Sequence, residues 1–182
     1  METLAITSKG PVSMAMFRDH LRVYHTADDI NIRSALDTAM AAWDAETLRP
    51  VRDTQYKQEF EQAPAGWQFN AGPVTEINSV KFFDKDTLVA TEIAASDYRV
   101  SRKGAWDKLQ FLYDFMANDS QAARWEVVWS VTWPHPPADV LRAIMMLGAT
   151  FYDERDQLTP LQMRAVTVGW NSITNRYKWG KF

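Results

Sequence analysis

The sequence contains no cysteine. This absence excludes disulfide bonds, thiolate zinc sites and cysteine nucleophiles, so packing alone must stabilise the fold, as suits assembly in a reducing cytoplasm. The chain also lacks an apolar run of about 18 residues, and its first residues lack the basic and apolar regions of a signal peptide. We therefore expect a protein that neither spans a membrane nor is exported by that route.

Excess positive charge is missing too. Lys and Arg number 20 against 23 Asp and Glu, for a net charge of -3 with the two signs interspersed. Tight binding to duplex DNA rests on clustered Lys and Arg, so the sequence offers no broad basic footprint for it.

Motifs for catalysis and metal binding are absent. The three histidines, His20, His25 and His135, show no metal-ligand spacing, and we expect the first two on helix surfaces and the third in a loop. No Gly-x-Ser-x-Gly elbow or Gly-rich phosphate loop occurs. The sequence predicts a protein that is not an enzyme and has no cofactor.

Two carboxylate pairs could in principle form a glycosidase-like dyad. Glu59 and Glu61 alternate along an expected strand and are more typical of its solvated face, whereas Asp84 and Asp86 are typical of a hairpin turn. These pairs are the sole support for a hydrolase.

The chain has 182 residues, 46% of them hydrophobic, which suits one domain with an insertion. Eight tryptophans are unusual. They fit either a Trp-rich core or an interface with a partner.

Helical periodicity marks the two ends of the chain. Apolar residues recur at helical spacing from Pro11 to Tyr24, and again after a cap at Thr26 or Asp28, in a helix that should stop before Pro50.

A third helix is expected from Asp139 to Tyr152, and a fourth opens at Thr159-Pro160. The third helix has an apolar arc wide enough for its own core and a neighbouring subunit. Our subunit-interface candidates are Met145, Phe151, Tyr152 and Trp170.

The middle of the chain reads as β structure, with turn signals at Ala65-Gly66, Ala71-Gly72-Pro73 and Lys103-Gly104. The clearest strand, Trp125 to Trp133, places three Trp and two Val on one face. The other expected strands are Gln55–Gln62, Ile77–Phe83, Leu88–Ile93, Tyr98–Ser101 and Leu109–Phe115, the last of which could also be a helix.

These patterns predict an α+β fold, a helical core of about four helices with an inserted antiparallel β region. We expect helices in 1–50, the β region in 51–133, helices again in 134–174 and a C-terminal arm in 175–182. Alternating aromatic and basic side chains suit that arm to docking on another protein. The candidate contact residues are Arg176, Tyr177, Lys178, Trp179, Lys181 and Phe182.

From about Val12 to Thr159 the chain resembles the head-tail connector, or adaptor, family of tailed bacteriophages. Before the third helix the resemblance rests on Leu21-Arg22-Val23, Asp28-Asp29, the small residues Ala35, Ala39 and Ala42, Thr47-Leu48-Arg49-Pro50 and Asp97-Tyr98-Arg99-Val100. The family commonly has Thr-Gly-Arg where this chain has Thr47-Leu48-Arg49.

The most specific stretch is the third helix. It carries Pro137, Arg142-Ala143-Ile144, Leu147-Gly148-Ala149 and Phe151-Tyr152-Asp153-Glu154-Arg155. The segment between Lys103 and Trp133 is longer than usual for the family.

The resemblance implies a virion protein of the neck, assembled in the bacterial cytoplasm as a ring of about twelve copies. Such a ring docks under the portal protein through its C-terminal arm, passes genomic double-stranded DNA without reading its sequence, and offers a surface to the tail or a stopper protein. Two alternatives remain at this point. One is another tail component, a stopper or tail terminator, and the other is a tail-borne cell-wall hydrolase.

Overall fold

The structure, a computed structural model, describes residues 1–102, 106–112, 122–153 and 160–180, with only the backbone for 160–168. It has two compact units. Ser8–Arg52 and Trp133–Lys178 form a helical unit, and Met1–Thr7, Asp53–Thr132 and the segment from Trp179 onward form a sheet unit. The predicted α+β fold, four helices with an antiparallel β region, is confirmed for the described residues.

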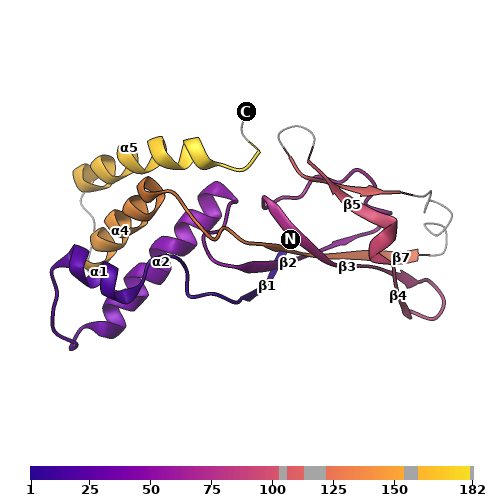
Figure 1. The fold of residues 1–182 in the computed structure, drawn as a ribbon, viewed down its shortest axis with the longest axis horizontal. Helices are drawn as coiled ribbons and strands as arrows, with labels where there is room; N and C mark the ends of the chain where they lie inside the picture. Colours follow the sequence, from indigo (N-terminus) through magenta and orange to yellow (C-terminus); the bar gives the residue numbers. More distant parts are fainter. Residues whose placement is uncertain (103–105, 113–121, 154–159, 181–182) are drawn as a thin grey trace. The chain divides into compact units, whose positions relative to one another are not determined.

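The helical unit contains four helices among the described residues (Figure 1). Their bounds are α1 Met14–Leu21, α2 Asp29–Thr47, α4 Ala138–Asp153 and α5 Pro160–Tyr177. None of the described helices is long and apolar enough to cross a bilayer.

Helix α1 is shorter than the sequence predicts. It begins where the Ser13 hydroxyl accepts the N–H of Met16 at 3.2 Å, and it ends because Arg22 takes a left-handed conformation with φ of 58°. Tyr24, expected on the apolar face of this helix, therefore lies beyond it with 79% of its surface exposed. His25, expected on a helix surface, lies in the same connection.

Helix α2 is the central support of the helical unit. Asp28 occupies its N-cap position, as expected, but makes no side-chain capping bond and instead accepts the Tyr152 hydroxyl at 2.9 Å. The helix ends before Pro50, as predicted, because Leu48 adopts a left-handed conformation with φ of 53°.

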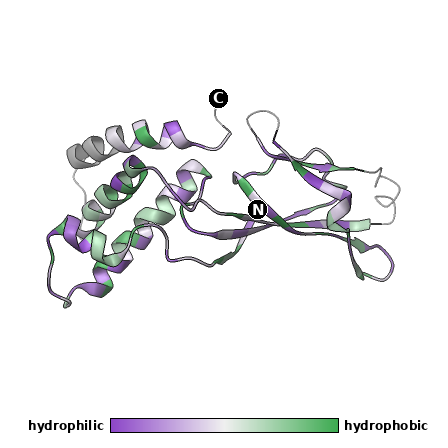
Figure 2. Cartoon of the chain, in the orientation of Figure 1, coloured by the Kyte–Doolittle hydropathy of each residue, from purple (hydrophilic) through white to green (hydrophobic). Residues whose placement is uncertain are grey.

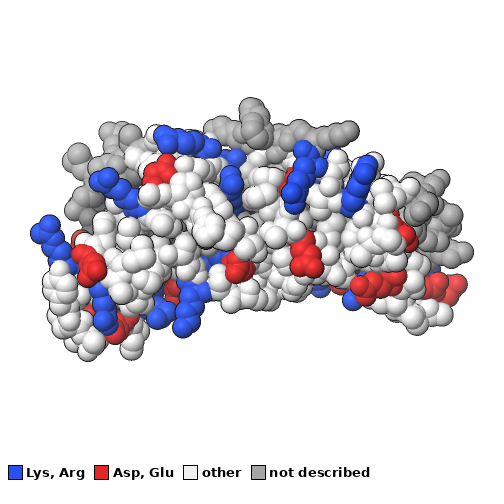
Figure 3. Space-filling model, viewed as in Figure 1, with Lys and Arg blue, Asp and Glu red and all other residues white. Residues whose placement is uncertain are grey.

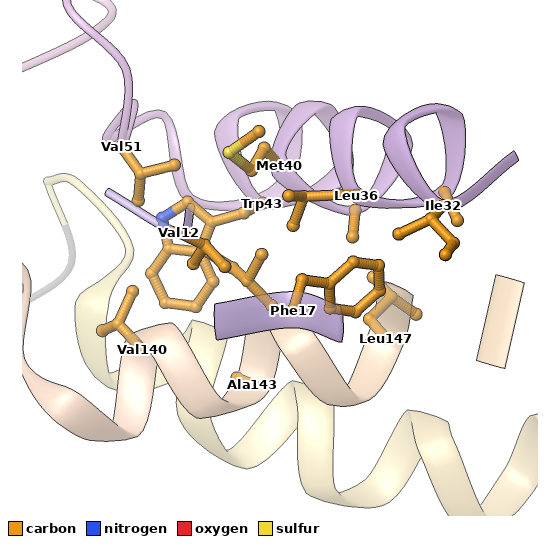
Figure 4. Close-up of a cluster of buried hydrophobic side chains, with 13 residues drawn as sticks. Val12, Phe17, Ile32, Leu36, Met40, Trp43, Val51, Val140, Ala143 and Leu147 are labelled. Carbon is orange, nitrogen blue, oxygen red and sulfur yellow. The ribbon is translucent and has the colours of Figure 1, made fainter. Parts of the chain in front are cut away.

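One hydrophobic cluster fills the helical unit (Figure 4). Phe17, Ile32, Trp43 and Ile144 are fully buried in it. α2 and α4 each carry hydrophobic and hydrophilic residues on different sides, so their apolar sides can face this core (Figure 2).

The sheet unit has one five-stranded antiparallel sheet and one two-stranded ribbon. The sheet order is β1-β2-β7-β3-β4, and β5 pairs with β6. The bounds are β1 Glu2–Ile6, β2 Thr54–Phe60, β3 Val74–Asp84, β4 Ala90–Glu92, β5 Tyr98–Ser101, β6 Lys108–Phe111 and β7 Ala122–Val131, with a short 3-10 helix, η1, at Ala95–Asp97.

Strand β7 is central and confirms the predicted alternation. Trp125, Val127, Trp129 and Val131 are fully buried on one face. Three aromatic rings, those of Tyr56, Trp67 and Phe69, lie with their centroids 5.2–5.5 Å from that of Trp129.

Trp133 was expected on the same strand and lies elsewhere. The strand ends at Val131, because the Thr132 N–H donates to the Thr75 hydroxyl at 2.9 Å and Pro134 has no N–H to donate. Trp133 belongs to the helical unit, where its ring lies 5.9 Å from that of Tyr177.

Other strand expectations hold with shifted ends. Strand β2 stops at Phe60, so Glu61 lies outside it. The ambiguous segment beginning at Leu109 is a strand as far as Phe111. Its end at 113–115 and the turn expected at Lys103-Gly104 lie outside the described residues.

Candidate assembly surfaces

The C-terminal contact candidates start inside helix α5, since Arg176 and Tyr177 are its last two residues. Both reach the first turn of α4. The Tyr177 hydroxyl lies 3.0 Å from each carboxylate oxygen of Asp139, and an Arg176 guanidinium nitrogen lies 3.2 Å from one of them. The end of α5 is thus tied to the start of α4.

Tyr177 is also a packing residue. Its ring centroid lies 6.1 Å from that of Trp43, and the Arg49 guanidinium stacks 4.1 Å above the ring of Trp133, which neighbours Tyr177. Burial and the bond to Asp139 raise the pKa of Tyr177, so its hydroxyl remains a neutral donor. The Tyr177 ring therefore packs against residues of its own subunit.

Lys178 and Trp179 are also held by their own chain. The Lys178 ammonium lies 3.2 Å from a Glu46 carboxylate oxygen, and both side chains are partly exposed. The Trp179 indole N–H donates to the Phe69 carbonyl at 3.2 Å, and its ring meets Trp106 edge-on at 6.3 Å. We call the place formed by Phe69, Gly72 and Trp106 the Trp179 slot.

Lys181 and Phe182, the remaining candidates for portal contact, lie outside the described residues. Arg176 is the most open of the others, with 63% of its side chain exposed, and Lys178 follows with 39%.

The subunit-interface candidates mostly face their own core. Met145, Phe151, Tyr152 and Trp170 are partly buried against the hydrophobic cluster of the helical unit. Trp170 meets Trp43 edge-on at 5.7 Å. A neighbouring subunit could cover only the parts of these side chains that remain exposed.

Sequence reasoning missed Met146, a large hydrophobic residue of α4 that has 52% of its surface exposed. It lines a mainly apolar pocket of about 110 Å³ between α4 and α5. The lining residues are Ala143, Met146, Leu147, Thr150, Gly169, Trp170 and Ile173. The available signal was the pair Met145-Met146. Adjacent residues of a helix point about 100° apart, so when Met145 packs against the core, Met146 must point away from it.

The carboxylate pairs show no catalytic arrangement in the described part of the chain. Glu59 lies 3.4 Å from Lys57 and 3.6 Å from Arg124, as on a solvated strand face. Asp84 forms the expected turn. Its carboxylate accepts hydrogen bonds from the N–H and hydroxyl of Thr87 and from the N–H of Asp86, and these bonds lower the pKa of Asp84. No group of three potential metal ligands occurs among the described residues.

No protein-family model matches the chain, and no curated protein matches it by sequence. Solved structures do match. A chain from the neck of an empty gene transfer agent (GTA) particle, computed with C6 symmetry, has a TM-score of 0.66 and 21% identity, covering 93% of this chain and 95% of its own.

Two further matches come from native particles. A chain of the virion of a native GTA particle has a TM-score of 0.67 at 22% identity, covering 93% of this chain and 95% of its own. A chain of the native GTA neck, computed with C12 symmetry, has a TM-score of 0.67 at 20% identity, covering 98% and 95%. The fold is therefore shared with these chains along nearly the whole length of both.

Proposed function

We propose that this protein is a structural subunit of the neck of a tailed, phage-like particle, and that it is the ring-forming adaptor between portal and tail. The observation that carries this proposal is the fold shared, over 93–98% of the sequence, with two chains of GTA necks and one chain of a GTA virion. The sequence signatures of the head-tail connector family agree with it. Fold likeness alone does not fix a function, so the adaptor role needs its own test.

The ring is proposed to contain twelve copies. One matching neck was computed with C12 symmetry and another with C6, and both symmetries are compatible with a closed ring of twelve subunits. The lumen of such a ring would pass double-stranded DNA. The contacts between copies are proposed to include the exposed parts of Met145, Phe151, Tyr152 and Trp170.

The portal contact is proposed to lie at the C-terminus. Arg176 and Lys178 remain partly exposed while paired with Asp139 and Glu46, so they can exchange these partners for carboxylates on another protein. Lys181 and Phe182 follow Gly180 in the sequence and complete the proposed contact set. Weak contacts repeated around a ring would give firm attachment.

The test is co-sedimentation of the purified full chain with assembled portal of the same particle, followed by particle imaging. We expect a ring of this protein below the portal. A variant ending at Gly180, and Arg176→Ala with Lys178→Ala, should each bind portal less, while Arg33→Ala, an exposed residue of α2, serves as the control.

Other outcomes would redirect the assignment. A ring located at the tail side, away from the portal, would identify a stopper or tail terminator. Unchanged binding by both C-terminal variants would contradict the portal-contact assignment, and failure of the unaltered chain to join the portal would contradict the adaptor role.

A further inference from the structure

The ribbon formed by β5 and β6 has two unlike faces. Tyr98 and Leu109 are buried on one face, in the core of the sheet unit. The opposite face is polar, because Arg99 pairs with Gln110 and Ser101 pairs with Lys108. Gln68 extends this face by bridging to Lys108. We call these five outward residues, Gln68, Arg99, Ser101, Lys108 and Gln110, the ribbon face.

All five side chains of the ribbon face can donate hydrogen bonds, and none is a carboxylate. Arg99 and Lys108 lie diagonally across the two strands, about 7–8 Å apart at the backbone. Arg102, the residue that follows β5, is exposed and adds a third cation at this end of the ribbon.

The Arg99 guanidinium is held in place. Its Nε donates to Gln110 Oε1 at 3.1 Å, which orients the group and leaves its terminal nitrogens as donors. Arg102 uses one terminal nitrogen for the Val74 carbonyl at 3.1 Å. Side chains fixed in this way lose less entropy when a ligand binds.

The acidic residues nearest to the ribbon face in sequence accept hydrogen bonds from groups outside this face. Asp107, beside Lys108, is buried and accepts the Val74 N–H at 2.8 Å. Asp97, before β5, accepts the Ser96 hydroxyl at 2.9 Å. In the space-filling view, Lys and Arg side chains lie over β5 while Asp and Glu side chains gather over β4 (Figure 3).

We propose that the ribbon face binds the phosphate backbone of double-stranded DNA without reading its bases. Arg, Lys, Ser and Gln are the side chains that contact phosphate oxygens, and an acid-free face avoids repelling them. The choice of duplex DNA as the polyanion rests on the proposed function. The net charge of -3 describes the whole chain and does not cancel a local cluster on one face.

Such a contact is weak and sensitive to salt. Neutralising two or three phosphates gives a slope of log K against log salt of about -2 to -3. One subunit therefore holds DNA loosely, which suits a surface along which DNA slides, whereas copies of the face in one assembly act together.

The experiment measures fluorescence anisotropy of a labelled mixed-sequence duplex with the full-length protein at low and rising salt. The test variant is Arg99→Gln with Lys108→Gln. The matched control is Arg33→Gln with Arg142→Gln, which removes the same charge from exposed residues of α2 and α4. Circular dichroism confirms that both variants fold.

We expect the ribbon variant to lose about tenfold or more in affinity at low salt, with a salt slope shallower by about 2. The control should change less than about twofold, since it leaves the cluster intact. Equal losses in both variants would mean that charge acts diffusely, and would overturn the proposal. Absence of duplex binding by the unaltered chain at the lowest salt would overturn it as well.

The portal test separates this inference from the adaptor role. A chain that joins the portal but fails to bind duplex contradicts only the ribbon face. A chain that binds duplex through this face but never joins the portal contradicts only the adaptor role.

Discussion

Gly72 leaves the space that the indole of Trp179 occupies. A Cβ atom at position 72 would lie 2.5 Å from Cε2 and Cζ2 of Trp179 and 3.0 Å from its Nε1. Gly180 follows Trp179 in the chain. It likewise has no room for a Cβ beside Trp106, and its φ is +74°. Two glycines therefore permit the chain end to enter the Trp179 slot.

Filling position 72 should expel Trp179 from the slot. Gly72→Ala and Trp179→Ala are both expected to make the C-terminus more sensitive to carboxypeptidase. Trp179→Ala should also lower the free energy of unfolding by about 2 kcal/mol, less than for a fully buried aromatic because the indole is half-buried. Timed digestion with mass spectrometry and denaturant titration measure the two effects.

Trp179→Phe separates ring packing from the hydrogen bond. It keeps an aromatic ring in the slot but removes the donor to the Phe69 carbonyl, so we expect a loss of about 1 kcal/mol. A Trp179→Ala variant as stable and as protease-resistant as the unaltered chain would show that the slot does not hold the C-terminus in solution.

The docking of Trp179 in the slot could not be predicted from the sequence. Trp179 and Phe69 are 110 residues apart, and no local pattern indicates that one receives the other. An aromatic and basic chain end is typical both of a free arm and of a docked one, and only tertiary contacts distinguish them. Strand β1 was missed for a similar reason, because its five residues are mostly exposed and gain their order by pairing with β2.

Local periodicity was sufficient elsewhere. The alternation along β7 predicted which side chains are buried. The helical spacing expected before Pro50 predicted an apolar face for α2, and Ile32 and Trp43 are fully buried on it. The sequence left open whether the eight Trp belong to the core or to an interface. In the structure they serve mainly the core, since Trp43, Trp125 and Trp129 are fully buried and the other five are partly buried. These features follow from residues close in sequence, where the period alone fixes the face.

Leu48 stands where the family that the chain resembles commonly has glycine, and it is the residue that ends α2. Its φ of 53° is the left-handed conformation that favours glycine at a helix end. We predict that Leu48→Gly is more stable than Leu48→Ala by about 1 kcal/mol, because both lose the side chain but only alanine keeps the strained Cβ. Thermal unfolding of the two variants measures this difference. The opposite order, which is usual inside helices, would contradict the left-handed cap.

Gly148 allows α4 to pack against Phe17. A Cβ at this position would lie 2.8 Å from Cζ of Phe17 and 3.6 Å from Cβ of Ala39. Gly148→Ala should therefore destabilise the helical unit by about 1 kcal/mol, as crowding outweighs the better helix propensity of alanine. Gly169→Ala in α5 is the matched control, since nothing lies within 4 Å of its added Cβ, and it should stabilise by up to about 1 kcal/mol. Denaturant unfolding that gave both variants the same sign would contradict the close approach.

Asp44 makes stability depend on pH. Its carboxylate accepts the Val51 N–H at 2.9 Å and pairs with Arg52 at 3.0 Å, yet burial outweighs these contacts and raises the pKa of Asp44 above its ordinary 3.8. The folded state then holds the proton more tightly than the unfolded state does. The resulting stabilisation is complete below pH 3.8 and is lost as the pH rises through the raised pKa.

Asp44→Asn provides a reference that does not titrate and keeps an acceptor for Val51. We expect the free energy of unfolding of the unaltered chain, minus that of Asp44→Asn, to fall as the pH is raised from about 3 towards 7. Urea titrations of both proteins at each pH measure this difference, in which the other ionisable groups cancel. A difference that instead rises with pH would mean that the ion pair with Arg52 outweighs burial, so that the folded protein favours the charged carboxylate.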